Sequence, residues 1–231
     1  MVEIIPAILP KNYEDLKDKI SLVRGFTPYV QIDICDGIFV QNKTWPFTSG
    51  NDLDTHFRKI LNEEEGLPFW EDIEFELDLM TIDAVENFDI YTKLGISRIV
   101  FHLLKNQKIE EFRDFLEGID TYLKDNIEIG VALELNQDVP NIFPLINCVD
   151  FVQIMGIEKI GFQGQDFSKK CIEYIKILKE RFPDLIISID GGVDLETASL
   201  LVHEGVDRLV IGSAIFNKED VLGTIEEFRN L

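Results

Sequence analysis

The feature that most constrains the fold is a regular alternation of short apolar runs with longer amphipathic segments along all 231 residues. The short runs are rich in β-branched residues, which is typical of buried strands, while the apolar residues of the longer segments recur at helical spacing. The expected strands are residues 3–9, 29–34, 73–80, 96–103, 127–135, 150–155, 185–190 and 207–213. The expected helices include residues 12–24, 107–124, 167–181, 194–204 and 218–229.

A strand–helix alternation repeated eight times predicts an α/β fold, a single (β/α)₈ TIM barrel. An open doubly wound sheet is the alternative, but eight regular units occupy the chain and leave no room for a second domain. We therefore expect one barrel domain over residues 1–231. Residues 40–50 form a longer irregular stretch, and residues 62–68 are typical of a charged surface loop.

Composition argues against several classes of partner. The formal net charge of −21 disfavours nucleic acid and anionic membranes, because both are bound through clustered Lys and Arg. No apolar run approaches the ~18 residues of a membrane span, and the first residues lack the features of a secretory signal. We expect a cytoplasmic protein. A small phosphorylated ligand stays compatible with this charge, because backbone N–H groups can hold phosphate without basic side chains.

Polar residues occupy one face of the second expected strand. In VQIDIC, Gln31, Asp33 and Cys35 share a face because side chains alternate along a strand, and the opposite face is aliphatic. In a barrel, inward residues at the carboxyl ends of strands face the site built by the following loops. Asp33 is therefore a candidate functional residue.

The third expected strand places acids on its inward face. In IEFELDLM, Glu76 and Asp78 share that face, and buried acids are costly unless they are paired, neutral or bound to a cation. Asp78 lies nearest the strand end and is the site candidate. Glu76 is expected to pair with His102 on the neighbouring strand.

Glycine-containing loops follow the last three expected strands, and Asp190 ends the seventh. Loops after the last strands of such barrels frequently bind phosphate, and small residues let backbone N–H groups reach the phosphate oxygens. The candidate phosphate-binding residues are Gly161, Gly164, Gly191, Gly192, Gly212 and Ser213.

These segments, in this order and spacing, resemble the ribulose-phosphate 3-epimerase family. The resemblance covers nearly the whole chain, and its longer motifs are specific when taken together. It rests on PAIL (6–9), QIDICDGIFVQN (31–42), LDLM (77–80), FHL (101–103), GVAL (130–133), GFQGQDF (161–167), IDGGV (189–193) and GSAIF (212–216).

The resemblance implies an enzyme that epimerises a ketose phosphate at the carbon beside its carbonyl, as in the ribulose 5-phosphate to xylulose 5-phosphate step of the pentose phosphate pathway. It assigns the acid and base roles to Asp33 and Asp190, which would lie on opposite sides of a planar enediolate. It also implies a homo-oligomer. The residues that would line the substrate pocket are Ala7, Cys35, Met80 and Met155.

The metal site that the resemblance implies is altered. The family uses two aspartates and two histidines, and the histidine positions correspond here to Gln31 and Asp78. Gln31, Asp33, Asp78 and Asp190 offer only oxygen ligands, which favour Mg²⁺ or Mn²⁺ over Zn²⁺. The alternative is that no metal binds, in which case at least one crowded carboxylate should be protonated near neutral pH, and a protonated Asp78 would be a hydrogen-bond donor.

Three functions therefore remain open. The first is an active epimerase. The second is a non-catalytic phosphosugar-binding barrel that has lost the metal site. The third is another phosphate-binding barrel enzyme, an isomerase or a lyase. The paired Asp33 and Asp190 favour the first, because a protein that only binds a sugar phosphate has no need of two facing carboxylates.

Overall fold

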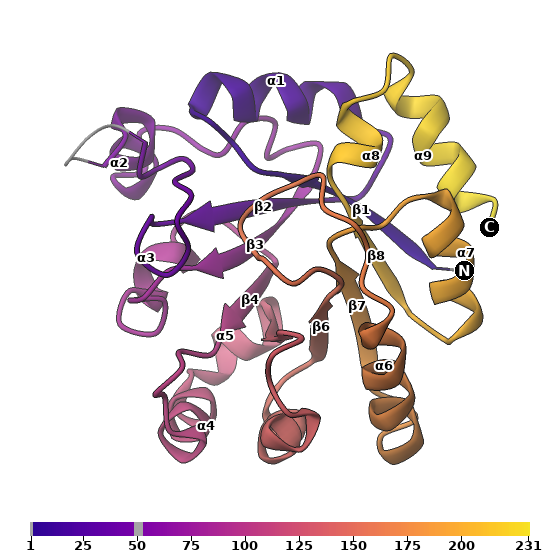
Figure 1. The fold of residues 1–231 in the computed structure, drawn as a ribbon. Helices are drawn as coiled ribbons and strands as arrows, with labels where there is room; N and C mark the ends of the chain where they lie inside the picture. The colour runs from indigo at the N-terminus through magenta and orange to yellow at the C-terminus, as the bar shows by residue number, and fades with distance from the viewer. Residues whose placement is uncertain (1, 49–52) are drawn as a thin grey trace.

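A computed structural model describes residues 2–48 and 53–231. Eight parallel strands close into a barrel in chain order, and helices surround it (Figure 1). The last strand pairs with the first, which closes the sheet. The predicted (β/α)₈ barrel is confirmed. Its strands are β1 (Glu3–Ile8), β2 (Tyr29–Cys35), β3 (Glu74–Met80), β4 (Arg98–His102), β5 (Glu128–Leu133), β6 (Phe151–Met155), β7 (Ile186–Asp190) and β8 (Arg208–Ile211).

The connections between strands are mostly α-helical. Several begin with an aspartate or asparagine whose side chain accepts a hydrogen bond from the first turn, as Asp194 does from the Thr197 N–H. Among the helices of the described residues, none combines the length and the apolar character needed to cross a membrane. The helices are α1 (Tyr13–Val23), α2 (Thr55–Leu61), α3 (Phe88–Thr92), α4 (Ile109–Gly118), α5 (Thr121–Asn126), α6 (Lys170–Arg181), α7 (Leu195–His203), α8 (Ser213–Phe216) and α9 (Val221–Arg229), with the 3₁₀ segment η1 (Val139–Cys148).

Two connections differ from the sequence expectation. The helix expected at 107–124 is two helices, α4 and α5, because Asp120 leaves helical geometry and caps α5 through the Tyr122 N–H at 2.8 Å. The connection between β5 and β6 is a 3₁₀ segment that contains Pro144, which cannot donate a helical hydrogen bond. In the irregular stretch expected at 40–50, residues 40–48 form turns and a bridge at Lys43, and residues 49 and 50 lie outside the described part of the chain.

The two faces of the barrel strands have different chemistry. The outward residues, such as Ile32 and Leu77, are fully buried in one apolar cluster between the strands and the helices. The inward residues include the polar side chains of Gln31, Glu76 and Gln153, each with 0% exposure. The expected alternation is confirmed, and it directs polar groups toward the barrel axis.

Ion pairs close the end of the barrel opposite the carboxyl ends of the strands. Arg98 Nη1 lies 3.1 Å from Glu3 Oε2, and Arg208 Nη2 lies 2.6 Å from Glu128 Oε2. Glu76 lies opposite Arg98 in the β3–β4 register, with 3.9 Å between Arg98 Nη1 and Glu76 Oε2. The expected Glu76–His102 pair is therefore wrong, because this register places Glu76 too deep in the barrel to reach His102.

Candidate functional site

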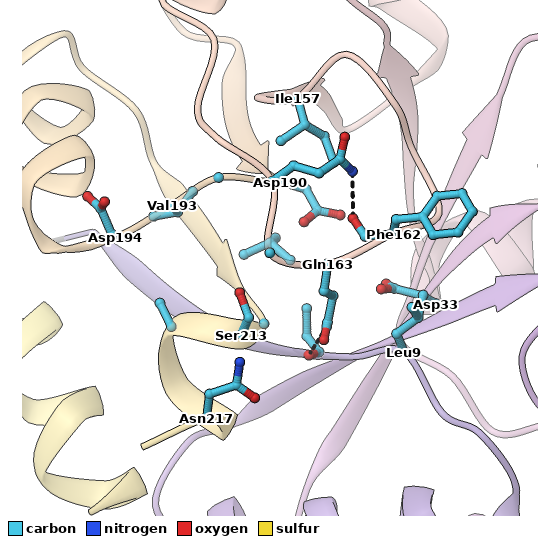
Figure 2. Close-up of a pocket in the computed structure, with 18 of the residues that line it drawn as sticks. Leu9, Asp33, Ile157, Phe162, Gln163, Asp190, Val193, Asp194, Ser213 and Asn217 are labelled. Carbon is cyan, nitrogen blue, oxygen red and sulfur yellow. Dashed lines mark hydrogen bonds between the residues drawn. The ribbon is translucent and has the colours of Figure 1, made fainter. Parts of the chain in front are cut away.

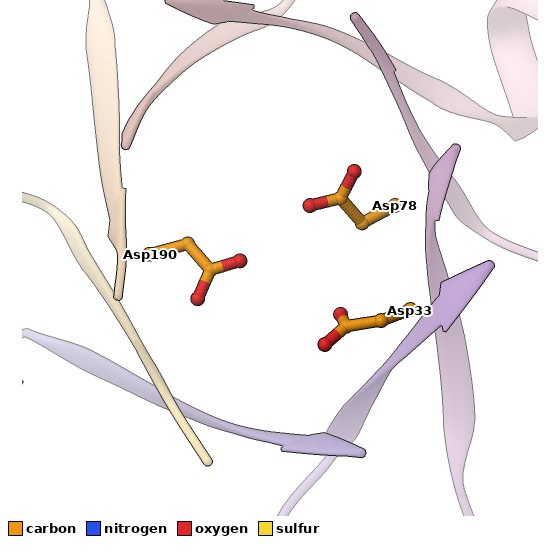
Figure 3. Close-up of side chains that lie close together, drawn as sticks. All are labelled: Asp33, Asp78 and Asp190. Carbon is orange, nitrogen blue, oxygen red and sulfur yellow. The ribbon is translucent and has the colours of Figure 1, made fainter. Parts of the chain in front are cut away.

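Three carboxylates meet at the mouth of the barrel. Asp33 comes from β2, Asp78 from β3 and Asp190 from β7, and one oxygen of each lies within 4.8 Å of the others. Figure 3 shows the three side chains pointing toward one another across the centre of the barrel. Asp33 and Asp78 are register partners on adjacent strands, whereas Asp190 reaches them from the opposite wall.

The loop after β2 is anchored so that Asp33 keeps its place. The Thr44 hydroxyl donates to the Asp33 carbonyl oxygen at 2.7 Å, which ties the returning loop to the strand. The Asp36 carboxylate accepts hydrogen bonds from the backbone N–H groups of Ile38 at 2.6 Å and Ile82 at 2.9 Å. Asp36 thereby links the loops after β2 and β3 and fixes two of the three carboxylate-bearing strands relative to each other.

A buried carboxamide connects two of the carboxylates. Gln31 Nε2 donates to Asp33 Oδ1 at 2.8 Å and to Asp190 Oδ2 at 3.0 Å. The Gln31 Oε1 atom is buried, and no described residue donates a hydrogen bond to it. The two carboxylates expected to act as acid and base are thus joined through one NH₂ group.

The third carboxylate, Asp78, is held by different donors. His102 Nε2 lies 2.6 Å from Asp78 Oδ1, and Gln153 Nε2 donates to Asp78 Oδ2 at 2.9 Å. Burial alone would lower the pKa of His102, but the Asp78 and Glu134 carboxylates outweigh it and raise the pKa to about 10. His102 is therefore an imidazolium at neutral pH, and Asp78 accepts hydrogen bonds on both oxygens.

Replacing His102 by Leu is expected to lower the free energy of unfolding by about 3–5 kcal/mol at pH 7, because removing one partner leaves the Asp78 charge buried and unpaired. The double variant His102→Leu/Asp78→Leu should recover part of this loss, because both charges are then gone. Urea denaturation of the wild type, both single variants and the double variant measures the effect. Additive losses in the double variant would contradict an ion pair.

Burial and mutual repulsion raise the pKa of both remaining carboxyl groups. Burial and the charges of Asp190 and Asp78 raise the pKa of Asp33 well above its usual value. Burial and the Asp78 charge raise the pKa of Asp190 to about 7. A carboxyl group with a pKa near neutrality can exchange a proton at physiological pH, which is what a general acid or base requires.

A cavity of about 640 Å³ opens above Asp33 and Asp190, which line it. Figure 2 shows Asp33 and Asp190 on its wall with Ser213 and Asn217 nearby. All six residues expected to bind phosphate line this cavity together with Ala7, Met80 and Met155. Cys35 does not line the cavity; it is fully buried, and its Sγ lies 4.0 Å from the Met80 Sδ. The structure thus brings both groups of predicted residues, acid/base and phosphate-binding, into one cavity.

The loop after β6 crosses the mouth of the cavity. Asn42 Nδ2 donates to the Gly161 carbonyl oxygen at 2.9 Å, which joins this loop to the one after β2. Gln163, labelled in Figure 2, donates from Nε2 to the Ala7 carbonyl oxygen at 3.2 Å. Its amide lies against Gly212. Gln163 therefore occupies part of the space beside the glycine loops.

The oxygen atoms of the site are the kind of ligand that a hard cation such as Mg²⁺ prefers. Asp33, Asp78 and Asp190 each offer a carboxylate oxygen, these oxygens lie within 4.8 Å of one another, and carboxylates are preferred ligands of Mg²⁺ and Mn²⁺. Gln31 presents its NH₂ group to two of these carboxylates, so in this orientation it donates hydrogen bonds and offers no lone pair to an ion.

Sequence reasoning missed two residues of this site. Gln153 stands between Phe151 and Met155 on the inward face of β6, so a lone amide in an apolar strand was the available signal. The second missed residue is Asp36. Its signal was the Asp–Gly pair at 36 and 37 directly after an expected strand, because an aspartate in a turn often accepts hydrogen bonds from the backbone N–H groups that follow it.

Comparison with known proteins assigns the family. A model of the ribulose-phosphate 3 epimerase family matches residues 3–216. The ribulose-phosphate 3-epimerase of Schizosaccharomyces pombe is 25% identical over 229 residues, covering 99% of this chain and 92% of the relative. That of Bacillus subtilis is 27% identical over 235 residues, covering 99% of both chains. The cytoplasmic isoform of Oryza sativa subsp. japonica is 28% identical over 219 residues, covering 93% of this chain and 87% of the relative.

Solved structures support the fold. A crystal structure of KGPDC from Streptococcus mutans superposes with a TM-score of 0.70 at 12% identity, covering 99% of this chain and 96% of that one. The 3-hexulose-6-phosphate synthase of Salmonella typhimurium gives a TM-score of 0.67 at 14% identity, covering 99% and 97%. Together with the match over residues 3–216, the arrangement of the barrel and its carboxylates means that this chain belongs to the ribulose-phosphate 3-epimerase family.

Proposed function

We propose that this protein is a sugar-phosphate 3-epimerase that interconverts ribulose 5-phosphate and xylulose 5-phosphate or a related ketose phosphate. The observation that carries the proposal is the placement of Asp33 and Asp190 on opposite walls of one cavity that the glycine loops also line. Proton transfer at a carbon beside a carbonyl requires a base on one face and an acid on the other. The family relationship supports the same reaction class.

Asp33 and Asp190 perform the proton transfers in this proposal. One carboxylate removes the C3 proton of the ketose to give an enediolate, and the other carboxyl group returns a proton to the opposite face. The pKa of about 7 for Asp190 suits this exchange, because a catalytic group works best when its pKa lies near the operating pH. The same two residues exchange roles in the reverse direction.

Backbone groups bind the phosphate in this proposal. The loops after β6, β7 and β8 line the cavity, and their small residues leave main-chain N–H groups accessible. Such a site explains how a chain with a net charge of −21 would bind an anion. The proposed phosphate ligands are Gly161, Gly164, Gly191, Gly192, Gly212 and Ser213, with Ala7, Met80 and Met155 against the sugar.

Gly192→Ala is expected to weaken phosphate binding more than the matched change Gly205→Ala. Gly192 has a φ of +70°, and a Cβ there would lie 2.6 Å from Phe167 Cα. Gly205 has a similar φ of +85°, but no described residue places an atom within 4 Å of its Cβ. Both changes should cost about 1–2 kcal/mol of stability through backbone strain, and only Gly192→Ala should displace the loop, costing about 1–3 kcal/mol more.

Urea denaturation and calorimetric titration with inorganic phosphate measure the two effects of the Gly192→Ala and Gly205→Ala changes. Equal phosphate affinities in the two variants would contradict the assignment of the loop after β7 to the phosphate.

The three carboxylates Asp33, Asp78 and Asp190 are the residues that would hold a divalent cation, and we propose Mg²⁺ or Mn²⁺ rather than Zn²⁺ because their ligand atoms are oxygens. Such a cation would supply positive charge that stabilises the enediolate oxygens. Asp78 also has a partner without an ion, because its Oδ1 lies 2.6 Å from Nε2 of the His102 imidazolium.

Deuterium exchange tests the proposed reaction directly. Incubation of the protein with ribulose 5-phosphate in D₂O should place deuterium at C3, with and without added Mg²⁺ or Mn²⁺, and NMR detects the label. A protein that gains thermal stability from ribulose 5-phosphate but introduces no deuterium would instead be a non-catalytic phosphosugar-binding barrel. Exchange at a different carbon would indicate another isomerase or lyase.

The setting of the proposed reaction follows from the same reasoning. We propose that the protein acts in the cytoplasm as a homo-oligomer within the pentose phosphate pathway, on a phosphorylated ketose and without nucleic acid or membrane partners. The strongly acidic composition supports the last part of this statement, because both of those partners attract basic surfaces.

A further inference from the structure

We propose that the Gln31 carboxamide is a built-in bridge between the two acid/base carboxylates, and that it competes with a divalent cation for them. In this role Gln31 is a positioning residue, which orders Asp33 and Asp190 without a resident ion. The inference rests on the proposed function for its catalytic consequence. Its structural part, the competition between amide and cation, is independent of any reaction.

The bridge uses both protons of one NH₂ group. Gln31 Nε2 is 2.8 Å from Asp33 Oδ1 and 3.0 Å from Asp190 Oδ2, so each N–H is directed to a different carboxylate. In the opposite amide orientation, Oε1 would lie at the same distances from the two oxygens and could accept a hydrogen bond only from a protonated carboxyl group, whereas the NH₂ group can donate to both. The donor orientation is therefore the one that these carboxylates select.

No described residue forms a hydrogen bond with the Gln31 amide oxygen that would compete with the two bonds on its nitrogen. Gln31 is fully buried, and Oε1 has no hydrogen-bond partner among the described residues. The position of the amide is thus set by the two carboxylates and by the β2 backbone. An acceptor left unpaired in the barrel interior is unfavourable, which indicates that the two hydrogen bonds on Nε2 outweigh it.

The remaining carboxylate is ordered separately. Asp78 accepts from His102 at 2.6 Å and from Gln153 at 2.9 Å, and neither donor bonds Asp33 or Asp190. Gln31 therefore joins two members of the trio, and Asp78 has donors of its own. The amide bridge explains how Asp33 and Asp190 stay ordered although both face the open cavity.

A cation at the trio would compete with the amide for the carboxylates. An ion that uses Asp33 Oδ1 or Asp190 Oδ2 must share that oxygen with the amide or turn the amide away, and an ion on their other oxygens would still face the positive end of the NH₂ dipole. Removing the amide should therefore make cation binding tighter. If Gln31 were a cation ligand instead, removing it would make cation binding weaker.

The test uses the intact protein with Gln31→Met, a change that keeps the length of the side chain and removes the donor. Mn²⁺ affinity is measured by electron paramagnetic resonance of free Mn²⁺, and C3 exchange of ribulose 5-phosphate is measured in EDTA and in saturating Mn²⁺. Gln153→Met is the matched variant, because it removes a buried amide that touches only Asp78 among the three carboxylates. Urea denaturation shows that each variant is folded.

We expect Gln31→Met to bind Mn²⁺ at least about tenfold more tightly than wild type, the ratio that the loss of one hydrogen bond to a charged group produces. Its kcat in EDTA should fall by about 10- to 100-fold with little change in KM, and saturating Mn²⁺ should restore most of it. Gln153→Met should tighten Mn²⁺ binding less than Gln31→Met, because it frees one carboxylate oxygen where Gln31→Met frees two, and His102 still holds Asp78.

Weaker Mn²⁺ binding by Gln31→Met would overturn the inference, as would a wild-type kcat for that variant in EDTA or equal shifts in Mn²⁺ affinity for Gln31→Met and Gln153→Met. A wild-type protein without any C3 exchange would overturn the proposed function alone. In that case the Mn²⁺ titrations still decide whether the amide and the cation compete.

Discussion

Replacing Asp33 or Asp190 by Asn is expected to lower the rate of C3 exchange in ribulose 5-phosphate by about 10²–10⁴-fold, the usual contribution of a positioned acid or base. Asn keeps the shape of the side chain but cannot carry the proton. The two losses should not multiply in the double variant, because proton removal and proton return belong to one reaction that either change already stops. NMR detection of deuterium incorporation in D₂O measures all three variants.

The same substitutions should leave the protein folded and make it more stable at pH 8. Burial and neighbouring charge raise the pKa of both carboxyl groups, so their ionised forms are unfavourable in the folded state. A neutral amide removes this repulsion. Urea denaturation at pH 8 should therefore show a higher free energy of unfolding for Asp190→Asn than for wild type, which separates a lost catalytic group from a lost fold.

Asp120→Asn is a matched control for the catalytic substitutions. Asp120 is exposed and caps α5, and Asn is an equally good capping residue, so exchange should stay at the wild-type rate. Retention of more than about a tenth of the wild-type rate in both Asp33→Asn and Asp190→Asn would contradict their roles, because a positioned acid or base contributes at least about 10²-fold.

Alternation along single strands made much of the site predictable. The pattern VQIDIC determines which residues of β2 face inward, and the structure directs Gln31 and Asp33 to the barrel axis as expected. The closed barrel itself follows from eight repeated units, each of which buries an aliphatic outer face beneath helices. These inferences need only local periodicity, which a single sequence contains.

Contacts across the barrel were not predictable in the same way. The Gln31–Asp190 hydrogen bond joins residues 159 positions apart, and it depends on the tilt and stagger of strands on opposite walls. The choice of Asp78 over Glu76 as the partner of His102 depends instead on the register of two adjacent strands, because the β3–β4 register sets Glu76 beside Arg98. Periodicity gives the face of a residue, and the register decides its depth.

The break between α4 and α5 shows a local limit. The apolar spacing in residues 107–124 continues through the break, so the pattern predicts one helix. The Asp120 side chain instead accepts the Tyr122 N–H and starts a second helix after Gly118 and Ile119. Capping residues compete with helix continuation on nearly equal terms, and tertiary packing decides between them.

The free energy of unfolding is expected to fall as the pH rises from 4 to 7. The folded-state pKa of Asp190 is raised from 3.8 to about 7, so over this range the folded protein resists a deprotonation that the unfolded chain undergoes freely. The cost is absent below the unfolded pKa and complete above pH 7, and a shift of this size corresponds to on the order of 4 kcal/mol. The raised pKa of Asp33 acts in the same direction.

The comparison of wild type with Asp190→Asn isolates the contribution of Asp190 to the pH dependence of stability, because ionisation of the other acidic residues is common to both proteins. Their difference in free energy of unfolding, measured by urea denaturation at each pH, should be small at pH 4 and should grow in favour of the variant up to pH 7. Above pH 7 a separate decline is expected in both proteins, since the ion pair of His102, with its pKa of about 10, is lost as the pH approaches that value. A difference between the two proteins that does not change between pH 4 and pH 7 would show that Asp190 titrates normally.

Mg²⁺ or Mn²⁺ should offset the loss of folding stability that ionised Asp33 and Asp190 cause at high pH, and should change the stability little at low pH. A cation binds the ionised carboxylates and competes with their protons, so the stabilisation should grow as the pH rises toward 7. At 100 times its dissociation constant, an ion that binds only the folded state adds about 2.7 kcal/mol. Thermal unfolding at pH 5 and pH 8, with EDTA or with Mn²⁺, measures the effect, and Asp33→Asn/Asp190→Asn should abolish it. Equal stabilisation of that double variant would place the cation away from the three carboxylates.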